Sequence, residues 1–230
     1  MTVKNIQLPK EHIFQKENDE CCGPCCLAMV YKIKGKNISL GQILKDLKLG
    51  EKGLPTYPPQ LARHLNSNGL RTKLTISNSQ VISPAWANEV KSKVIENLKY
   101  WVTFQPKHDW HEFGLHALFY LQEGGEIELK SYGISDIKKM LDSGSTLILG
   151  VDEVFIWKHR FKEHKAEIDE IKGKSYGHFI VVTGYKENKF SILDSYPTKI
   201  PNKYGSYEVN GNDLLNASLI WAATILEVLK

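Results

Sequence analysis

All four cysteines of this chain fall within one six-residue window, in the order Cys21-Cys22-Gly-Pro-Cys25-Cys26. The cysteines of a structural disulfide framework connect distant segments, so they are spread along a sequence. Thiols crowded into one short segment cannot cross-link a fold in that way. The cluster therefore indicates chemistry or packing within a single element.

The composition is that of an ordinary globular protein. The 230 residues are 42% hydrophobic and 24% charged, enough for one sizeable domain. The net charge of +4, from 30 Lys+Arg and 26 Asp+Glu, is too small to indicate nucleic-acid or membrane binding. The sequence has no apolar run of about 18 residues and no apolar signal-peptide core at its start. We therefore expect a cytoplasmic protein with no nucleic-acid partner and no membrane partner.

Helix and strand signals predict an α+β fold in a single domain over residues 1–230. Residues 1–70 show a helical pattern with start and stop residues at Pro24, Ser39 and Asn68-Gly69. Residues 80–125 repeat apolar residues at helical spacing and are predicted to be a helical insertion. Residues 145–230 are predicted to form an antiparallel sheet against the helical part. The predicted helices are 23–33, 40–49, 58–69, 111–121 and 135–144, and the predicted strands are 70–76, 126–130, 145–151, 178–185, 189–196, 204–209 and 218–229.

Cys22 lies where a nucleophilic thiol is expected. A thiol attacks as thiolate, which a helix N-terminus and a cationic neighbour both favour. Cys22-Gly23-Pro24 stands at the start of a predicted helix, where unpaired N–H groups attract negative charge. His178 and Asp194 follow far downstream, in the order that cysteine proteases use.

The segment around His178 predicts a specific contact. Strands 178–185 and 189–195, joined by a three-residue turn at 186–188, pair Tyr185 with Lys189 and therefore Ile180 with Asp194. His178 and Asp194 then become diagonal neighbours on one face, within reach of an imidazole–carboxylate hydrogen bond. A two-residue turn would place Asp194 on the opposite face, and the absence of Asn-Gly or Asp-Gly argues against such a turn.

The same residues resemble a known family. Gln15-KENDE-Cys21-Cys22-GPCCLAMV, and Gly177-His178-FIVVTGY followed by Asp194, are similar to the motifs of C39-type peptidases and their stand-alone relatives. The resemblance implies a papain-like fold and a hydrolase acting on a peptide or protein substrate without a cofactor. It also implies roles: Cys22 as nucleophile, His178 as base, Asp194 as its orienting partner and Gln15 as an oxyanion ligand.

Several alternatives remain at this point. Cys21 is an alternative nucleophile, and the same triad could serve an acyltransferase or ligase. The fold could also be a catalytically silent binding module. Cys22-Gly-Pro-Cys25 matches the C-x-x-C of thioredoxin-like redox proteins, although there the motif follows a buried strand and here it follows polar QKENDE.

No metal site is predicted, because zinc modules pair two C-x-x-C units and this chain has one. Five other histidines are interpreted as surface or packing residues, those of the insertion because their spacing does not match a helical zinc site. They are His108, His111 and His116 in the predicted insertion, and His159 and His164 in a charged stretch.

Overall fold

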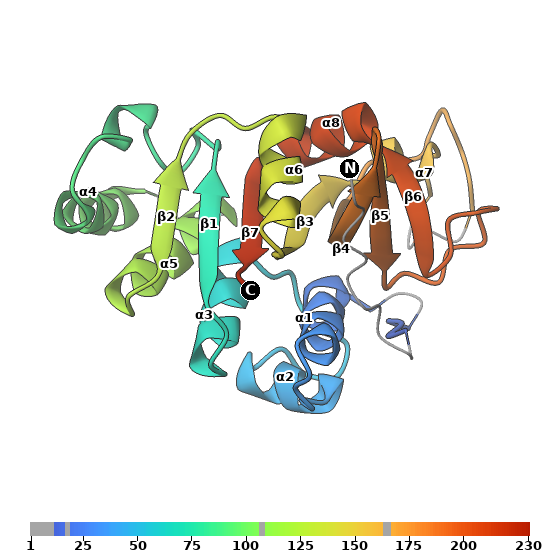
Figure 1. Cartoon of the computed structure of the whole chain (residues 1–230), viewed down its shortest axis with the longest axis horizontal. Coiled ribbons are helices and arrows are strands. Elements are labelled where there is room, and N and C mark those ends of the chain that lie inside the picture. Colours follow the sequence, from blue (N-terminus) through green and yellow to red (C-terminus); the bar gives the residue numbers. More distant parts are fainter. Residues whose placement is uncertain (1–11, 17–18, 106–108, 163–166) are drawn as a thin grey trace.

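A computed structural model describes residues 12–16, 19–105, 109–162 and 167–230 (Figure 1). Its helices are α1 (Cys22–Ile33), α2 (Leu40–Asp46), α3 (Pro58–Ser67), α4 (Lys91–Phe104), α5 (Asp109–Gln122), α6 (Ile134–Asp142), α7 (Glu153–Trp157) and α8 (Gly211–Trp221), with a 3-10 helix η1 at Pro84–Trp86. Its strands are β1 (Thr72–Ile76), β2 (Glu126–Leu129), β3 (Thr146–Asp152), β4 (Gly177–Lys186), β5 (Lys189–Asp194), β6 (Ser206–Asn210) and β7 (Thr224–Val228). None of the described helices is long and apolar enough to cross a bilayer.

The strands of the described residues form one seven-stranded sheet in the order β2-β1-β7-β3-β4-β5-β6. Neighbouring strands are antiparallel except β1 and β2, which are parallel. The predicted α+β class is therefore confirmed. The sheet is not confined to residues 145–230, because β1 and β2, which precede residue 145, join the same sheet.

Each face of the sheet is covered by its own helices. Strand residues alternate between the faces, so Ile148 and Val181 pack with α1, α3 and α5. Their neighbours Leu149 and Val182 pack with α6, α7 and α8 on the other face. In the view of Figure 1, α1 to α3 group at the lower side and α8 runs along the upper side. The two apolar layers hold the ends of β4 and β5, where the site residues lie, between helices.

The C-terminal segment corrects one prediction. Residues 218–229 were expected to form one strand, but α8 continues to Trp221 before β7 begins at Thr224. The apolar run shows no break in the sequence because the helix ends without glycine or proline; instead Ala223 takes a positive φ of 44°. Helix α7 was not predicted, although Asp152 caps it by accepting from the N–H of Val154 at 2.9 Å.

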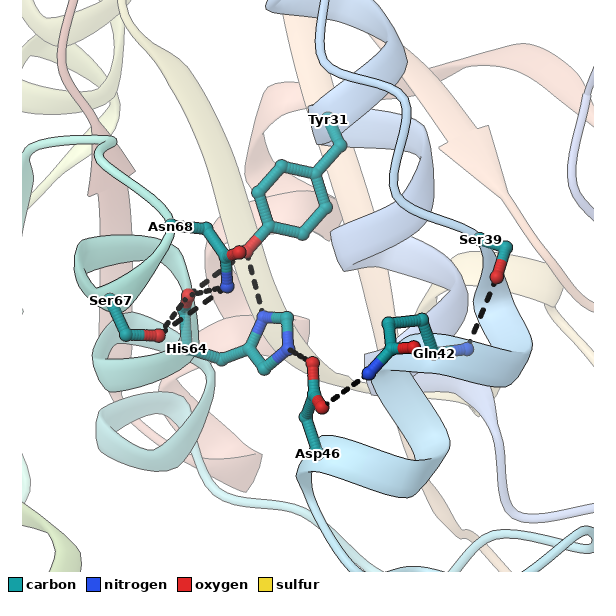
Figure 2. Close-up of polar contacts among 7 residues, drawn as sticks. All are labelled: Tyr31, Ser39, Gln42, Asp46, His64, Ser67 and Asn68. Atoms are coloured by element: carbon teal, nitrogen blue, oxygen red, sulfur yellow. Dashed lines mark hydrogen bonds and ion pairs between the residues drawn. The ribbon is translucent and has the colours of Figure 1, made fainter.

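A polar network, buried at Tyr31 and His64 and exposed at Asp46 and Gln42, joins the first three helices (Figure 2). The Tyr31 hydroxyl on α1 lies 2.7 Å from Nδ1 of His64 on α3, and Nε2 of His64 lies 3.4 Å from Asp46 on α2. Gln42 Nε2 donates to the same carboxylate at 2.6 Å. Burial lowers the pKa of His64, against the opposing influence of Asp46. The network is therefore built around a neutral imidazole.

This network predicts a pH-dependent stability. Because the folded-state pKa of His64 is lowered, its neutral form stabilises the fold above about pH 6.5, and that contribution is lost as the pH falls through the lowered value. We expect the free energy of unfolding in urea to drop less between pH 7 and pH 5 in His64→Gln than in wild type. In the control His159→Gln, at an exposed histidine, the free energy of unfolding should drop as much as in wild type. An identical pH dependence in His64→Gln and wild type would contradict the prediction.

Candidate active site

Cys22 is the first residue of α1 and is half-buried. The first turn of this helix is Cys-Gly-Pro-Cys, so its N–H groups and the positive end of the helix dipole lie at the sulfur-bearing residue. Gly23 is required for close packing, because a Cβ there would lie 2.2 Å from Oγ1 of Thr56. The local sequence thus fixes the start of α1 and presents a thiol at its N-terminus.

The other three cysteines are buried in the core. All four lie within the described residues, and none is joined in a disulfide. Burial, followed by the charges of Asp19, Cys22 and Glu20, raises the pKa of Cys21 to about 11. Burial likewise holds the pKa of Cys25 and of Cys26 well above the usual thiol value, and neither side chain has exposed surface. Thiol–disulfide exchange needs a reachable, ionisable second thiol, so this burial argues against the redox interpretation of the C-x-x-C.

His178 and Asp194 form the predicted contact. His178 Nε2 lies 2.7 Å from Oδ1 of Asp194, and both side chains are inaccessible to solvent. His178 is the second residue of β4 and Asp194 is the last residue of β5. Asp194 pairs with Ile180 in the ladder, as the sequence predicted.

The route to this register was predicted wrongly. Lys186 pairs with Lys189, so the turn has two residues rather than three. A β-bulge between Val182 and Gly184 shifts the register by one residue and restores the pairing of Ile180 with Asp194. Glu187 adopts the positive φ of 55° that a tight turn requires, without the expected glycine. Because the bulge cancels the shorter turn, the two side chains remain on one face.

Four donors surround the carboxylate of Asp194. Oδ1 accepts from His178 Nε2 and, at 2.9 Å, from the backbone N–H of Tyr196. Oδ2 accepts from Trp157 Nε1 at 3.0 Å and from the Tyr207 hydroxyl. Burial is the largest influence and raises the pKa of Asp194, but His178, Tyr207 and the Tyr196 N–H together outweigh it and hold the pKa below its usual value. Asp194 is therefore ionised at neutral pH.

An ionised Asp194 fixes the tautomer of His178. A carboxylate accepts hydrogen bonds and cannot donate, so the proton in the contact belongs to Nε2 of the imidazole. In the neutral ring Nδ1 is then the basic nitrogen. Trp157 packs against the ring with centroids 5.2 Å apart, and Tyr196 lies edge-on at 6.4 Å. These aromatic contacts hold the ring plane in place.

Gln15 lies beside the end of β5. Its backbone N–H donates to the carbonyl of Ser195 at 2.9 Å, and its Oε1 accepts from the Ser195 hydroxyl at 3.0 Å. Its Nε2 donates to the carbonyl of Asp19 at 2.7 Å. The amide group is thus buried in a fixed orientation, and Nε2 carries a second N–H.

Three residues of the site were not found from sequence. Trp157 and Tyr207 reach Asp194 from α7 and β6, and His12 Nε2 donates to the backbone carbonyl of Asp194 at 2.7 Å. No spacing rule connects them to Asp194. Asp152, which ends the buried strand β3 and caps α7, is the signal that could have indicated α7 and its Trp157.

Of the five histidines interpreted as surface or packing residues, three have such contacts in the structure. His111 donates from Nε2 to the carbonyl of Val102 at 3.1 Å, His116 stacks on Tyr57, and His159 pairs with exposed Glu170. His108 and His164 lie outside the described residues. Across the part of the chain that the structure describes, no group of three or more His, Cys, Asp or Glu side chains is arranged to hold a metal ion.

The donors around Asp194 predict a measurable cost. Tyr207→Phe removes one hydrogen bond to a buried charge, which should lower the free energy of unfolding at pH 7 by about 1.5–3 kcal/mol. The loss should shrink only as the pH falls through the lowered pKa of Asp194, where the carboxylate takes up a proton. Tyr204→Phe, at an exposed tyrosine three residues away, is the matched control and should be neutral. Equal urea denaturation midpoints for the two variants would contradict the prediction.

Comparison with known proteins gives a family match. The model of the Peptidase_C39 like family matches residues 8–224. No curated protein matches the chain.

Several solved structures are similar to the chain, among them the following three. A chain described as a C39-like peptidase from Bacillus anthracis has 11% sequence identity and a TM-score of 0.51, with 98% of this chain and 95% of that chain covered. A double glycine motif protease from an AMS/PCAT transporter, in complex with the leader peptide, has 14% identity and a TM-score of 0.47, with 98% and 94% covered. The peptidase domain of Streptococcus ComA has 13% identity and a TM-score of 0.43, with 95% and 97% covered. The papain-like fold of this chain is assigned from its similarity to the first of these structures.

Proposed function

The chain belongs to the peptidase C39-like family and is a cysteine peptidase, and from that premise we propose that it cleaves peptide bonds with a triad of Cys22, His178 and Asp194. The observation that carries the proposal is the buried hydrogen bond of 2.7 Å between His178 Nε2 and Asp194 Oδ1. It leaves Nδ1 as the basic nitrogen of an imidazole held next to an ionised carboxylate. A peptide or protein is the proposed substrate, and the double-glycine specificity of transporter-linked enzymes is not part of the proposal.

The first half of the reaction forms an acyl-enzyme. Cys22 gives its proton to Nδ1 of His178, and the thiolate attacks the carbonyl carbon of the scissile bond. The backbone N–H of Cys22 and Nε2 of Gln15 stabilise the resulting oxyanion, each donor contributing about 3 kcal/mol. His178 then protonates the departing amine, the C–N bond breaks, and a thioester on Cys22 remains. Asp194 stabilises the imidazolium that exists between these two proton transfers.

The second half releases the product. Water attacks the thioester while Nδ1 of His178 takes its proton, and the C–S bond breaks to give a carboxylic acid and the free thiol. An amine acceptor in place of water would give acyl transfer by the same chemistry. Hydrolysis and transfer differ only in the nucleophile of this step, so the assay must separate their products.

The proposal predicts a sharp contrast between neighbouring cysteines. Incubation with a denatured protein such as casein, with products sequenced by mass spectrometry, should give new carboxyl termini with wild type and none above background with Cys22→Ala. Cys25→Ala, which shortens a buried side chain on the same helix, is the matched control and should keep most of the activity. Addition of glycinamide separates hydrolysis from transfer, because a captured acyl group gives an amide of higher mass. Cleavage by Cys22→Ala at the wild-type rate, or its loss in a folded Cys25→Ala, would contradict the assignment.

The acid of the triad has its own test. Asp194→Asn keeps the shape of the side chain but allows the other tautomer of His178, with the proton on Nδ1. We expect kcat/KM for peptide cleavage to fall by at least about a hundredfold, since losing the equivalent acid costs serine proteases more. Asp142→Asn, on the exposed surface, is the control. A loss below tenfold in a folded Asp194→Asn would show that Asp194 does not act in the triad.

A further inference from the structure

A solvent-exposed tryptophan lies directly beside the residue that precedes His178. Trp221 ends α8, and 45% of its surface is exposed. A Cβ added to Gly177 would lie 2.0 Å from Cε2 and 2.1 Å from Nε1 of the indole. The ring therefore rests against the backbone of Gly177, and glycine at this position is what lets it approach so closely.

The residues after Trp221 fix its position. Ala222 is buried against Gly150, and its carbonyl accepts from Nδ2 of Asn78 at 3.3 Å. The carbonyl of Ala223 accepts from the N–H of Ser77 at 2.8 Å. The backbone that follows Trp221 is thus buried and hydrogen-bonded, while much of the indole surface is exposed to solvent. A large ring already ordered in this way loses little conformational entropy on binding a partner.

Trp221 lies on the same side of β4 as the helix that carries Cys22. Gly177 and Phe179 share one face of β4, because alternate residues of a strand point the same way. Phe179 belongs to the apolar cluster against which Cys22 packs. The indole on Gly177 is therefore on the α1 side of the strand, next to the peptide that joins Gly177 to His178.

The exposed surface here is apolar over three consecutive residues. Leu219 is 40% exposed and Ile220 57% exposed, next to Trp221. Of these three residues, Trp221 is the one in contact with the segment that carries His178, through Gly177. An exposed aromatic ring at that place points to a ligand of the proposed reaction centre.

We propose that Trp221 forms a substrate subsite, in which the exposed indole contacts an apolar side chain of the peptide close to the scissile bond. The inference rests on the proposed function and adds to it a preference for peptides with an apolar side chain near the scissile bond. Aliphatic and aromatic side chains are the class that such a surface recognises, through loss of apolar area from water.

The test compares two peptides in two enzymes. Cleavage sites in casein define the position at which wild type prefers an apolar residue, and a pair of fluorogenic peptides then carries Leu or Ala there. In Trp221→Ala, kcat/KM for the Leu peptide should fall about tenfold, mainly through KM, while that for the Ala peptide changes less than about twofold. Inactivation by iodoacetamide, too small to reach the subsite, should keep its rate. Phe104→Ala, which truncates an exposed aromatic on α4, should leave both peptides unaffected.

Each other outcome counts against the subsite. Equal losses on both peptides, or slower inactivation by iodoacetamide, would mean that Trp221 supports His178 through Gly177 instead. Unchanged values for both peptides would mean that the patch serves another partner. If Trp221→Ala does not fold, Ile220→Asp places a charge beside the indole at an exposed position and should lower the Leu preference in the same direction. Wild type no more active than Cys22→Ala would refute the proposed function itself, and the subsite with it.

Discussion

The ionised carboxylate of Asp194, enclosed without exposed surface, is the interaction on which the arrangement of this site depends. A buried charge is strongly destabilising without its partners: removing the charged partner of a buried ion pair costs about 3–5 kcal/mol. Here the partners arrive from β4 (His178), α7 (Trp157) and β6 (Tyr207), together with a backbone N–H just after β5. The folded chain satisfies this charge only when all four segments are in place. The hydrogen bond to this ionised carboxylate also sets the tautomer of His178 on which the proposed chemistry relies.

The segment before α1 is tied to the same point. His12 binds the carbonyl of Asp194, while Gln15 binds both the backbone and the hydroxyl of Ser195. The proposed oxyanion ligand and the proposed acid are therefore held by adjacent residues of one strand end. At the far end of α1, Tyr31 contacts His64 on α3 and so anchors the helix that starts with Cys22. The proposed nucleophile, base and acid thus lie on elements whose relative positions are fixed by buried polar contacts.

The sequence identified what local rules encode and missed what only the tertiary fold creates. The start of α1 at Cys22 and the pairing of Ile180 with Asp194 followed from helix-start residues and strand counting. The bulge after Val182 and the two-residue turn were not predicted. Each shifts the strand register by one residue, and because the two shifts cancel, the predicted pairing is still found. Trp157 and Tyr207 were missed because their role exists only once α7 and β6 are brought to Asp194. The end of α8 was missed because Ala223 takes a left-handed conformation that its residue type does not announce.

The central claim is that His178, oriented by Asp194, keeps the thiol of Cys22 reactive, and alkylation by iodoacetamide with mass mapping of the modified cysteine tests it most directly. At mildly acidic pH we expect modification at Cys22, with Cys21, Cys25 and Cys26 remaining protonated and buried. His178→Ala should slow the reaction of Cys22 at that pH by at least about tenfold and bring its pH dependence close to that of an ordinary thiol. Preferential modification of Cys21, or a Cys22 that reacts equally fast in wild type and in His178→Ala, would contradict the claim.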